Sequence, residues 1–520
     1  MYQELPAKYK KTYIIINQND WQLPMMRIIR NSIVFLTIVL LAGGCTIQRN
    51  PVSGNKRLMA YTWSQEVQIG EEVDKEFTAQ YGLFDDYNTT DFVDKLGHKI
   101  LEVSHMRRED TDQKFRETEF YFRVLDSPVV NAFALPGGYV YVTRGLLAHL
   151  NNEAQLAVVI GHEIGHVAAR HASQRAVRQS LGQIAIIGGA VLGQEFLGLP
   201  GESILNMSSQ AAQLIFLSYS RDAERESDRL GVEYAAKAGY SAEEGAAFFT
   251  SLKRISEEAG QSIPSFLSSH PDPGEREKTI PELARDWADK GYEQRIRNEQ
   301  EYYELLDGMI FGQNPREGFL DNDRFVHPDL AFQFPVPDGW RLINERQQVI
   351  LLSSSEDAVM IFRIDGESES AQESVQTFTG QEGISVNNQT STQSSGRYDA
   401  HKADVTIVQD QGNLRALIWA LEYDDRIYRF INYTTEDSYE DYESAFTAVP
   451  ETFDELKDRN ILDVRPVTLQ MIPAEDAGRF ENFLPDELPM GISAEKVAII
   501  NQVELDDQIE AGRYLKIPVQ

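Results

Sequence analysis

The sequence is short of cysteine, of basic residues and of long apolar runs, and each shortage excludes a class of protein. One cysteine among 520 residues, Cys45, rules out an intramolecular disulfide. The 49 Lys and Arg residues face 81 Asp and Glu residues, and the formal net charge of −32 argues against nucleic-acid binding, which needs a basic face. It also argues against electrostatic binding to anionic lipid headgroups. The apolar runs 33–42 and 184–193 are too short to cross a bilayer, which takes about 20 residues.

What the chain does contain is enough apolar material for several cores. Its hydrophobic fraction is 42%, which is typical of a folded protein. A chain of 520 residues exceeds one ordinary core, so about two to four folded units are expected. The acidity then predicts a solvated surface that keeps these units soluble.

The N-terminus has the layout of a signal peptide, because two arginines precede the apolar run 33–42 and small residues lead to Cys45. Its end, LAGGC, resembles a bacterial lipoprotein box, with alanine where the usual pattern has leucine. The resemblance implies that Cys45 is lipidated, and several acyl chains anchor a protein stably. Because Thr46 is not the aspartate that retains lipoproteins in the inner membrane, the resemblance implies the periplasmic face of the outer membrane. Residues 1–44 are thus expected to be the signal peptide, with 1–24 as a misassigned upstream extension. A simple signal anchor or a buried helix is the alternative.

Hydrophobic patterning divides the rest of the chain into a tether and three folded units, an α+β multidomain architecture. The expected order is a lipidated tether at 45–62, an α-rich unit at 63–310, an antiparallel α+β unit at 325–458 and a small last unit at 464–520. The opening of the antiparallel unit resembles a PsbP-like domain, and the end of the chain resembles the closing half of a LysM module. The LysM resemblance suggests peptidoglycan as a partner.

Within the α-rich unit the periodicity predicts mostly helices around a few strands. A helix from Trp63 to Tyr81 is expected to be capped by Ser64. The other expected elements are a helix at 90–106, a strand at 119–124, two short strands within 131–142, a long helix at 152–178 and helices within 203–258 that break near 238–240. The apolar stretch 183–218 is open between a lid, a membrane contact and core packing, and the polar stretch 385–397 is interpreted as a surface loop.

The segment 162–166, HEIGH, lies in the expected long helix and points to a metal site. Residues four apart on a helix face the same way, so His162 and His166 direct two imidazoles at one point, and imidazole nitrogen suits zinc. Glu163 lies one step round the helix, beside a water that the metal would activate, which is the position of a general base. An ordinary helix with core or surface histidines is the alternative, but the apolar entry at 156–161 buries these groups and so demands partners for them.

A catalytic zinc needs a third protein ligand and an open fourth position. His171 is the nearest candidate, but it would lie about 180° round the same helix from the first motif histidine. The helical segment 221–229 instead offers Glu224 and Asp228 on one face, whereas Glu226 lies about 200° from Glu224. Glu224 would then bind zinc, and Asp228 would accept the ring N–H of a ligating histidine. A charged, solvated helix is the alternative for this segment.

HEIGHVAARH followed by SRDAERESD resembles a family of membrane-stress zinc metallopeptidases that includes HtpX, the CAAX prenyl proteases and the periplasmic lipoprotein-type members BepA and LoiP. Further matches are NPVSG, the segment 64–70, NAFALPGG, and SHP at 269–271 with Arg276. The resemblance covers about 50–280 and implies a zincin-type (gluzincin) peptidase domain. The family's third-ligand motif, a glutamate with an aspartate four residues later, maps onto Glu224 and Asp228.

The resemblance also assigns roles outside these motifs. In the family the NAFALPGG segment forms a strand edge beside the zinc, so Asn131, Ala132, Phe133 and Ala134 are expected to pair with an extended substrate backbone. An ordinary hairpin is the alternative. His270 matches a histidine that in BepA-like members can fill the open zinc position and hold the enzyme latent. A turn residue before proline is the alternative for His270.

Together these features predict a zinc metalloendopeptidase with one zinc ion per chain, anchored in the outer membrane. The resemblance implies that it degrades misfolded or misassembled envelope proteins in periplasmic quality control. Two other functions stay open: a chaperone-like factor with a latent zinc site that works with the outer-membrane assembly machinery, and a cell-wall-binding lipoprotein with a structural zinc. The intact Glu163 argues against an inactive site.

Overall fold

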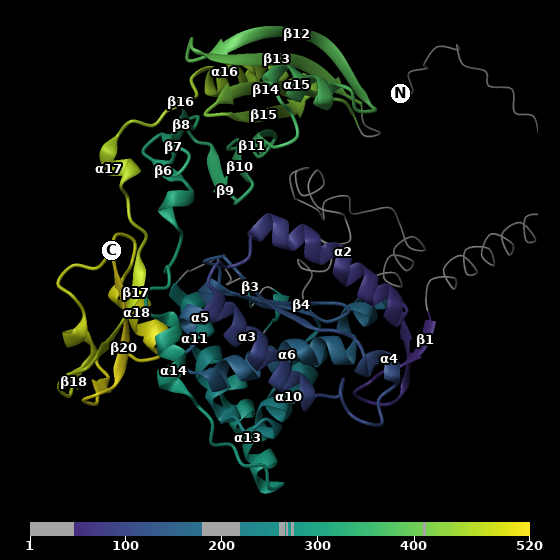
Figure 1. The fold of residues 1–520 in the computed structure, drawn as a ribbon, viewed down its shortest axis with the longest axis vertical. Coiled ribbons are helices and arrows are strands. Elements are labelled where there is room, and N and C mark those ends of the chain that lie inside the picture. The colour runs from purple at the N-terminus through teal and green to yellow at the C-terminus, as the bar shows by residue number, and fades with distance from the viewer. Residues whose placement is uncertain (1–45, 179–218, 259–265, 267–268, 272–274, 409–411) are drawn as a thin grey trace, which may run out of the picture.

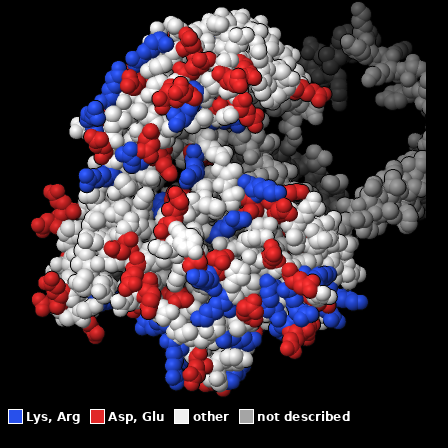
Figure 2. Space-filling model, in the orientation of Figure 1, with Lys and Arg blue, Asp and Glu red and all other residues white. Residues whose placement is uncertain are grey.

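The computed structural model describes residues 46–178, 219–258, 266, 269–271, 275–408 and 412–520 (Figure 1). The expected signal peptide, the lipidation residue Cys45 and the apolar stretch 183–218 therefore lie outside the described residues. None of the described helices is long and apolar enough to cross a membrane. Acidic and basic side chains alternate over the face shown in Figure 2, as expected for a solvated surface.

The α-rich unit packs helices on both faces of a small sheet (Figure 1). The sheet has the order β3-β5-β4, with β3 and β5 parallel and β4 antiparallel to β5. One face packs against α2, and the other packs against a larger core around α6. The elements are α2 Trp63–Tyr81, α3 Tyr87–Glu102, α4 Gln113–Arg116, β3 Tyr121–Leu125, β4 Ala132–Leu135, β5 Tyr139–Thr143, α5 Arg144–His149, α6 Glu153–Ala169, α10 Arg221–Lys237, α11 Gly245–Glu258, α13 Arg276–Asp289 and α14 Glu299–Leu306.

The second unit is a seven-stranded antiparallel sheet, as the sequence predicted for 325–458. Its order is β12-β13-β14-β15-β11-β10-β9. Alternate residues of a strand face opposite sides, so Val349 and Leu351 join the core under α16 while Ile350 and Leu352 join the core under α15. A four-stranded sheet, β16-β8-β7-β6, packs on the α16 side. The elements are β6 Phe319–Asp321, β7 Arg324–His327, β8 Phe332–Pro335, β9 Arg341–Asn344, β10 Gln348–Leu352, β11 Ala358–Asp365, α15 Ala371–Thr379, β12 Ile384–Ser394, β13 Tyr398–Ile407, β14 Leu414–Tyr423, β15 Arg426–Thr435, α16 Tyr439–Glu451 and β16 Asp454–Glu455.

The last unit pairs its first and last long strands and docks on the α-rich unit. Strands β17 (Thr468–Pro473) and β20 (Tyr514–Val519) are antiparallel, and α18 (Ala494–Asn501) lies between them in the chain, together with the short strands β18 (Gly478–Arg479) and β19 (Gln508–Ile509). The backbone of Leu469 exchanges hydrogen bonds of 2.8 Å with Gly308 and Met309. The fully buried Lys516 donates to the carbonyls of Ala148 and Leu150, at 2.7 and 3.0 Å. The LysM-like assignment of 464–520 stays a prediction, but this unit contacts the α-rich unit closely.

Four local predictions were wrong. Residues 46–59 are not a free tether, because β1 (Thr46–Arg49) pairs with β2 (Lys56–Met59) and Asn50 donates to the Ala169 carbonyl at 2.8 Å. Thr62, not Ser64, caps α2 and forms a capping box with Gln65. The polar stretch 385–397 is mostly the edge strand β12, hydrogen-bonded to β13.

The fourth correction concerns the helix that carries the HEIGH motif. It was expected to run through 152–178, but α6 ends at Ala169 because Arg170 adopts a left-handed conformation with φ 58° and ψ 43°. The helical turns resume at 171 with a new direction. The Arg170 guanidinium is buried and donates to the Glu66 carboxylate, at 2.6 Å from one of its nitrogens. This partner is 104 residues away, so local periodicity could not have revealed the break.

Candidate metal centre

Helix α6 presents the two histidines of the motif side by side in the core. Asn152 caps the helix by accepting the Gln155 N–H, and every residue of α6 is buried. The Nε2 atoms of His162 and His166 lie 3.0 Å apart. The two imidazoles therefore lie together, as their spacing of four residues along the helix predicts.

Helix α10 crosses α6 at a contact between two glycines, and this crossing brings Glu224 to the histidines. A Cβ on Gly231 would lie only 2.8 Å from the backbone nitrogen of His162, and a Cβ on Gly161 would lie 2.9 Å from the Gly231 carbonyl oxygen. The backbones can approach this closely only because neither residue has a side chain. Glu224 consequently lies 3.5 Å from the Nε2 atoms of both His162 and His166.

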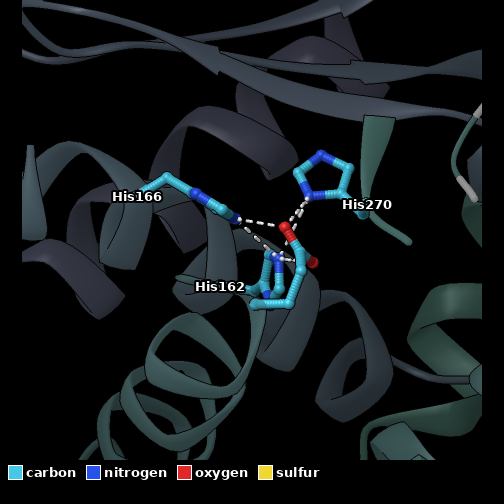
Figure 3. Close-up of side chains that lie close together, drawn as sticks. His162, His166 and His270 are labelled. Carbon is cyan, nitrogen blue, oxygen red and sulfur yellow. Dashed lines mark hydrogen bonds and ion pairs between the residues drawn. The ribbon is translucent and has the colours of Figure 1, made fainter. Parts of the chain in front are cut away.

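His270 completes a group of four buried side chains. Its Nδ1 lies 3.3 Å from His162 Nε2 and 3.4 Å from Glu224 Oε1. Its ring stacks on Phe266 at a centroid distance of 4.8 Å. Figure 3 shows the three imidazoles converging on one point from different directions. One ligand atom from each of His162, His166, Glu224 and His270 lies within 4.8 Å of the others, so the group could hold a metal ion.

Asp228 and Arg276 orient these side chains from behind. Asp228 Oδ1 lies 2.9 Å from His162 Nδ1, on the opposite side of the ring from the cluster. The buried Arg276 donates to Asp228 and to Glu224, at 2.8 Å in each case. Sequence geometry placed Asp228 and Glu224 on one face, and the structure places both beside the histidines.

Glu163 lies next to the cluster without joining it. Its side chain is fully buried, and Oε1 is 3.6 Å from His270 Nε2. Neither carboxyl oxygen accepts a hydrogen bond from any residue that the structure describes. Burial raises the pKa of Glu163, and the neighbouring His270 and His162 oppose this.

The carboxylates decide which imidazole holds a proton when no metal is bound. Burial alone would lower the pKa of His162, but the Asp228 and Glu224 carboxylates outweigh it and raise the pKa to about 9. Burial holds the pKa of His166 well below its usual range. Burial also opposes the ionisation of Glu224, but His270 and His162 outweigh it and lower the pKa of Glu224 well below its usual range. A cation entering the group therefore competes with a proton on His162.

The sequence prediction dismissed His171, which contacts a histidine of the cluster, and Glu226, which contacts His171, and it overlooked Tyr219. His171 was placed on the far side of a continuous helix, but the break at Arg170 brings its Nδ1 to 3.0 Å from His166 Nδ1. Glu226 lies 3.2 Å from His171 Nε2. The ring of Tyr219 stacks on His166 at a centroid distance of 4.0 Å. These contacts have no signal in the sequence beyond the residue types themselves.

The predicted substrate segment, Asn131–Ala134, lies at the edge strand β4 (Ala132–Leu135), with Asn131 directly before the strand. Because the Thr143 N–H donates to the Asn131 carbonyl, residues 131 and 143 form a hydrogen-bonded pair. The pattern alternates along an antiparallel pair, so the backbone N–H and C=O groups of Ala132 and Ala134 point away from β5. The Phe133 side chain packs under α2 instead. Any contact with an extended peptide at this edge is therefore made by the backbone.

Comparisons with known proteins match parts of the chain to peptidases. Residues 98–284 match the model of peptidase family M48. A Vibrio cholerae protein named as a beta-barrel assembly-enhancing protease is 31% identical over 44% of this chain and 45% of its own length. The mitochondrial metalloendopeptidase OMA1 of Bos taurus is 33% identical over 32% of this chain and 33% of its own. The Escherichia coli beta-barrel assembly-enhancing protease is 26% identical over 55% of this chain and 54% of its own. The chain thus spans about half or less of the length of these relatives.

Solved structures match the chain only weakly. Cyanobacterial PsbP from Synechocystis shares 14% identity with a TM-score of 0.22, over 25% of this chain and 91% of that protein. Such a score supports no argument about fold, so the PsbP-like assignment of 325–458 stays a prediction. The family match over 98–284 and the proteases among the relatives point in the same direction. The chain contains a segment, residues 98–284, that matches peptidase family M48.

Proposed function

We propose that the chain is a zinc-dependent metalloendopeptidase whose zinc ion is bound by His162, His166 and Glu224. The observation that carries this proposal is the convergence of these buried side chains with His270, within 4.8 Å of one another, beside the carboxylate of Glu163. Nitrogen and carboxylate oxygen are the ligands that zinc prefers outside thiolate sites. Glu224 Oε1 is buried in this cluster without a hydrogen-bond partner among the described residues, and a bound cation would satisfy it.

The roles of the residues follow from their positions. A bound zinc would polarise the scissile carbonyl and lower the pKa of a water. The Glu163 carboxylate would take a proton from that water as it attacks the carbonyl carbon, and would then pass the proton to the leaving amine nitrogen. Asp228 would fix the His162 ring by accepting from its Nδ1, and Arg276 would hold the carboxylates of Asp228 and Glu224 in place.

Substrate would bind as an extended chain along β4. The outward backbone groups of Ala132 and Ala134 would pair with the main chain of the substrate, which is a recognition mode with little dependence on side chains. This suits unfolded or misassembled proteins as substrates. Asn131 and Phe133 would act by holding the strand, through the backbone pair with Thr143 and the core under α2.

The general-base role of Glu163 is tested by the variant Glu163→Gln. The amide cannot take a proton, so we expect unchanged zinc content and a loss of cleavage of an unfolded protein by about 10²–10⁴-fold. Glu301→Gln, an exposed residue of α14, is the matched control and should cleave normally. If Glu163→Gln retains zinc and cleaves at the normal rate, the peptidase mechanism is wrong.

The position of His270 favours a second candidate, a chaperone-like assembly factor whose zinc site is latent. With four protein side chains in one group, a tetrahedral zinc has no position left for water. Replacing His270 by alanine should then raise peptidase activity while zinc stays bound. Cleavage that falls in His270→Ala would contradict latency, and activity absent from both proteins would favour the non-proteolytic factor.

The cellular role is proposed from the N-terminal pattern and the relatives' names. We place the chain on the periplasmic side of the outer membrane, anchored at Cys45, where it would degrade misassembled envelope proteins. The name shared by two relatives refers to beta-barrel assembly, which makes the outer-membrane assembly machinery a candidate partner. Membrane fractionation tests the anchor: Cys45→Ser should move the protein to the soluble fraction, and an unchanged distribution would exclude lipidation.

A third candidate is a cell-wall-binding lipoprotein with a structural zinc. It would follow if the LysM-like end at 464–520 binds peptidoglycan. Sedimentation of the full chain with purified sacculi tests this candidate, since a protein that stays in the supernatant does not bind the wall. The intact Glu163 favours the peptidase over this alternative.

A further inference from the structure

We propose that His171 and Glu226 position His166 for metal binding through a chain of two hydrogen bonds. The proposal rests on the metal site described above, and it assigns a role to two residues that contact no metal. The first bond joins His166 Nδ1 to His171 Nδ1 at 3.0 Å, and the second joins His171 Nε2 to Glu226 Oε2 at 3.2 Å.

The donor and the acceptor of each hydrogen bond follow from the orientation of the His166 ring. His166 turns Nε2 toward the cluster, at 3.0 Å from His162 Nε2 and 3.5 Å from Glu224 Oε1. A nitrogen that binds a metal must present its lone pair, so the proton of neutral His166 resides on Nδ1. Nδ1 then donates to His171 Nδ1, which leaves the His171 proton on Nε2. That proton points at the Glu226 carboxylate, which can only accept.

The position of His171 is held by contacts outside the cluster. The left-handed Arg170 ends α6 and turns the chain so that His171 is 2% exposed against α10. The Arg170 guanidinium is fixed by the Glu66 carboxylate and by the Tyr61 carbonyl, the latter at 2.8 Å. Ser227 Oγ lies 3.3 Å from His171 Nδ1 as a second, longer contact. Such a buried and multiply bonded turn leaves the His171 ring little freedom to rotate.

The two metal-facing histidines thus receive their support from one helix. Asp228 of α10 lies 2.9 Å from His162 Nδ1 and acts directly. Glu226 lies about 200° from Glu224 round α10, so it cannot reach the cluster itself. His171 lies between Glu226 and His166 and connects them by hydrogen bonds. Glu226 is half-buried and lies 3.9 Å from the Arg57 guanidinium. Its proposed role is to accept the hydrogen bond from His171.

The test is zinc affinity, measured by competition with a chelator on the full chain. His171→Leu removes the acceptor and should weaken zinc binding about 10–100-fold. His171→Asn restores an acceptor oxygen near the position of Nδ1 and should recover most of the affinity. His105→Leu is the matched control, because His105 is also buried and hydrogen-bonded, to the Tyr234 hydroxyl at 2.8 Å, far from the cluster in the chain.

Thermal unfolding of the zinc-free proteins separates positioning from stability. We expect His171→Leu and His171→Asn to unfold at similar temperatures and yet to differ in zinc affinity. Equal affinities for these two variants, or a loss no larger than in His105→Leu, would overturn the proposal. Glu226→Ala should also weaken zinc binding. An unchanged zinc affinity in this variant would show that Glu226 has no part in the pair of hydrogen bonds that positions His166. A wild-type protein that binds no zinc would instead contradict the metal site itself.

Discussion

Gly231→Ala should damage the metal site although it replaces none of the proposed ligands. The added Cβ would lie 2.8 Å from the backbone nitrogen of His162 and from the Val158 carbonyl oxygen, whereas ordinary contacts begin at 3.4 Å. Helices α6 and α10 must therefore separate by at least about 0.6 Å, because backbone atoms on both sides cannot rotate away. Overpacking of this kind costs about 1–3 kcal/mol, and the better helix propensity of alanine returns up to about 1 kcal/mol.

The larger effect is on geometry, because α10 carries Glu224 and Asp228. A metal site tolerates displacements of about 0.5 Å, so we expect zinc affinity to fall at least about tenfold. The assay is chelator competition together with thermal unfolding. Gly366→Ala is the control, because nothing lies within 4 Å of its added Cβ. Wild-type zinc affinity in Gly231→Ala would refute the claim that the glycine crossing sets the ligand geometry.

Four further predictions concern the proton on His162, the strand edge and the helix break. Zinc must displace the His162 proton, so apparent zinc affinity should rise by up to about tenfold per pH unit as pH approaches 9, and a flat profile in the titration would contradict this. The same raised pKa predicts that protonated His162 stabilises the zinc-free protein fully below about pH 6.5 and that this stabilisation is lost as pH rises through about 9. Chemical denaturation with a chelator present measures this change in unfolding free energy. Ala134→Pro removes an outward N–H of β4 and should raise the KM for an unfolded substrate with zinc content unchanged, whereas an unaltered KM would exclude pairing there. Arg170→Met leaves the buried Glu66 carboxylate without its partner and should cost about 3–5 kcal/mol of unfolding free energy, a prediction that a change below about 1 kcal/mol would refute.

The sequence predicted the parts of this site that depend on local geometry. His162 and His166 are four apart on one helix, and Glu224 and Asp228 repeat that spacing on another, so periodicity alone placed each pair on one face. Their mutual approach depends on the Gly161–Gly231 crossing, which no local rule reveals. The family resemblance supplied that link, and it also supplied His270.

Most of the parts that failed depend on partners outside the segment whose structure was predicted. The helix break at Arg170 is stabilised by Glu66, and the strand pair β1–β2 is held against the end of α6 through Asn50. A polar stretch becomes strand β12 because β13 supplies its hydrogen bonds. In each case a tertiary contact outweighs the local preference on which the prediction was based.

We propose that one zinc ion is held by two histidines of α6 and a glutamate of α10. Anomalous diffraction at the zinc edge, from crystals of the zinc-loaded chain, tests this ligand set. We expect a single strong peak about 2.0–2.2 Å from His162 Nε2, His166 Nε2 and a Glu224 carboxylate oxygen. A zinc-loaded crystal whose peak lies away from Glu224, or that shows no peak between α6 and α10, would contradict it.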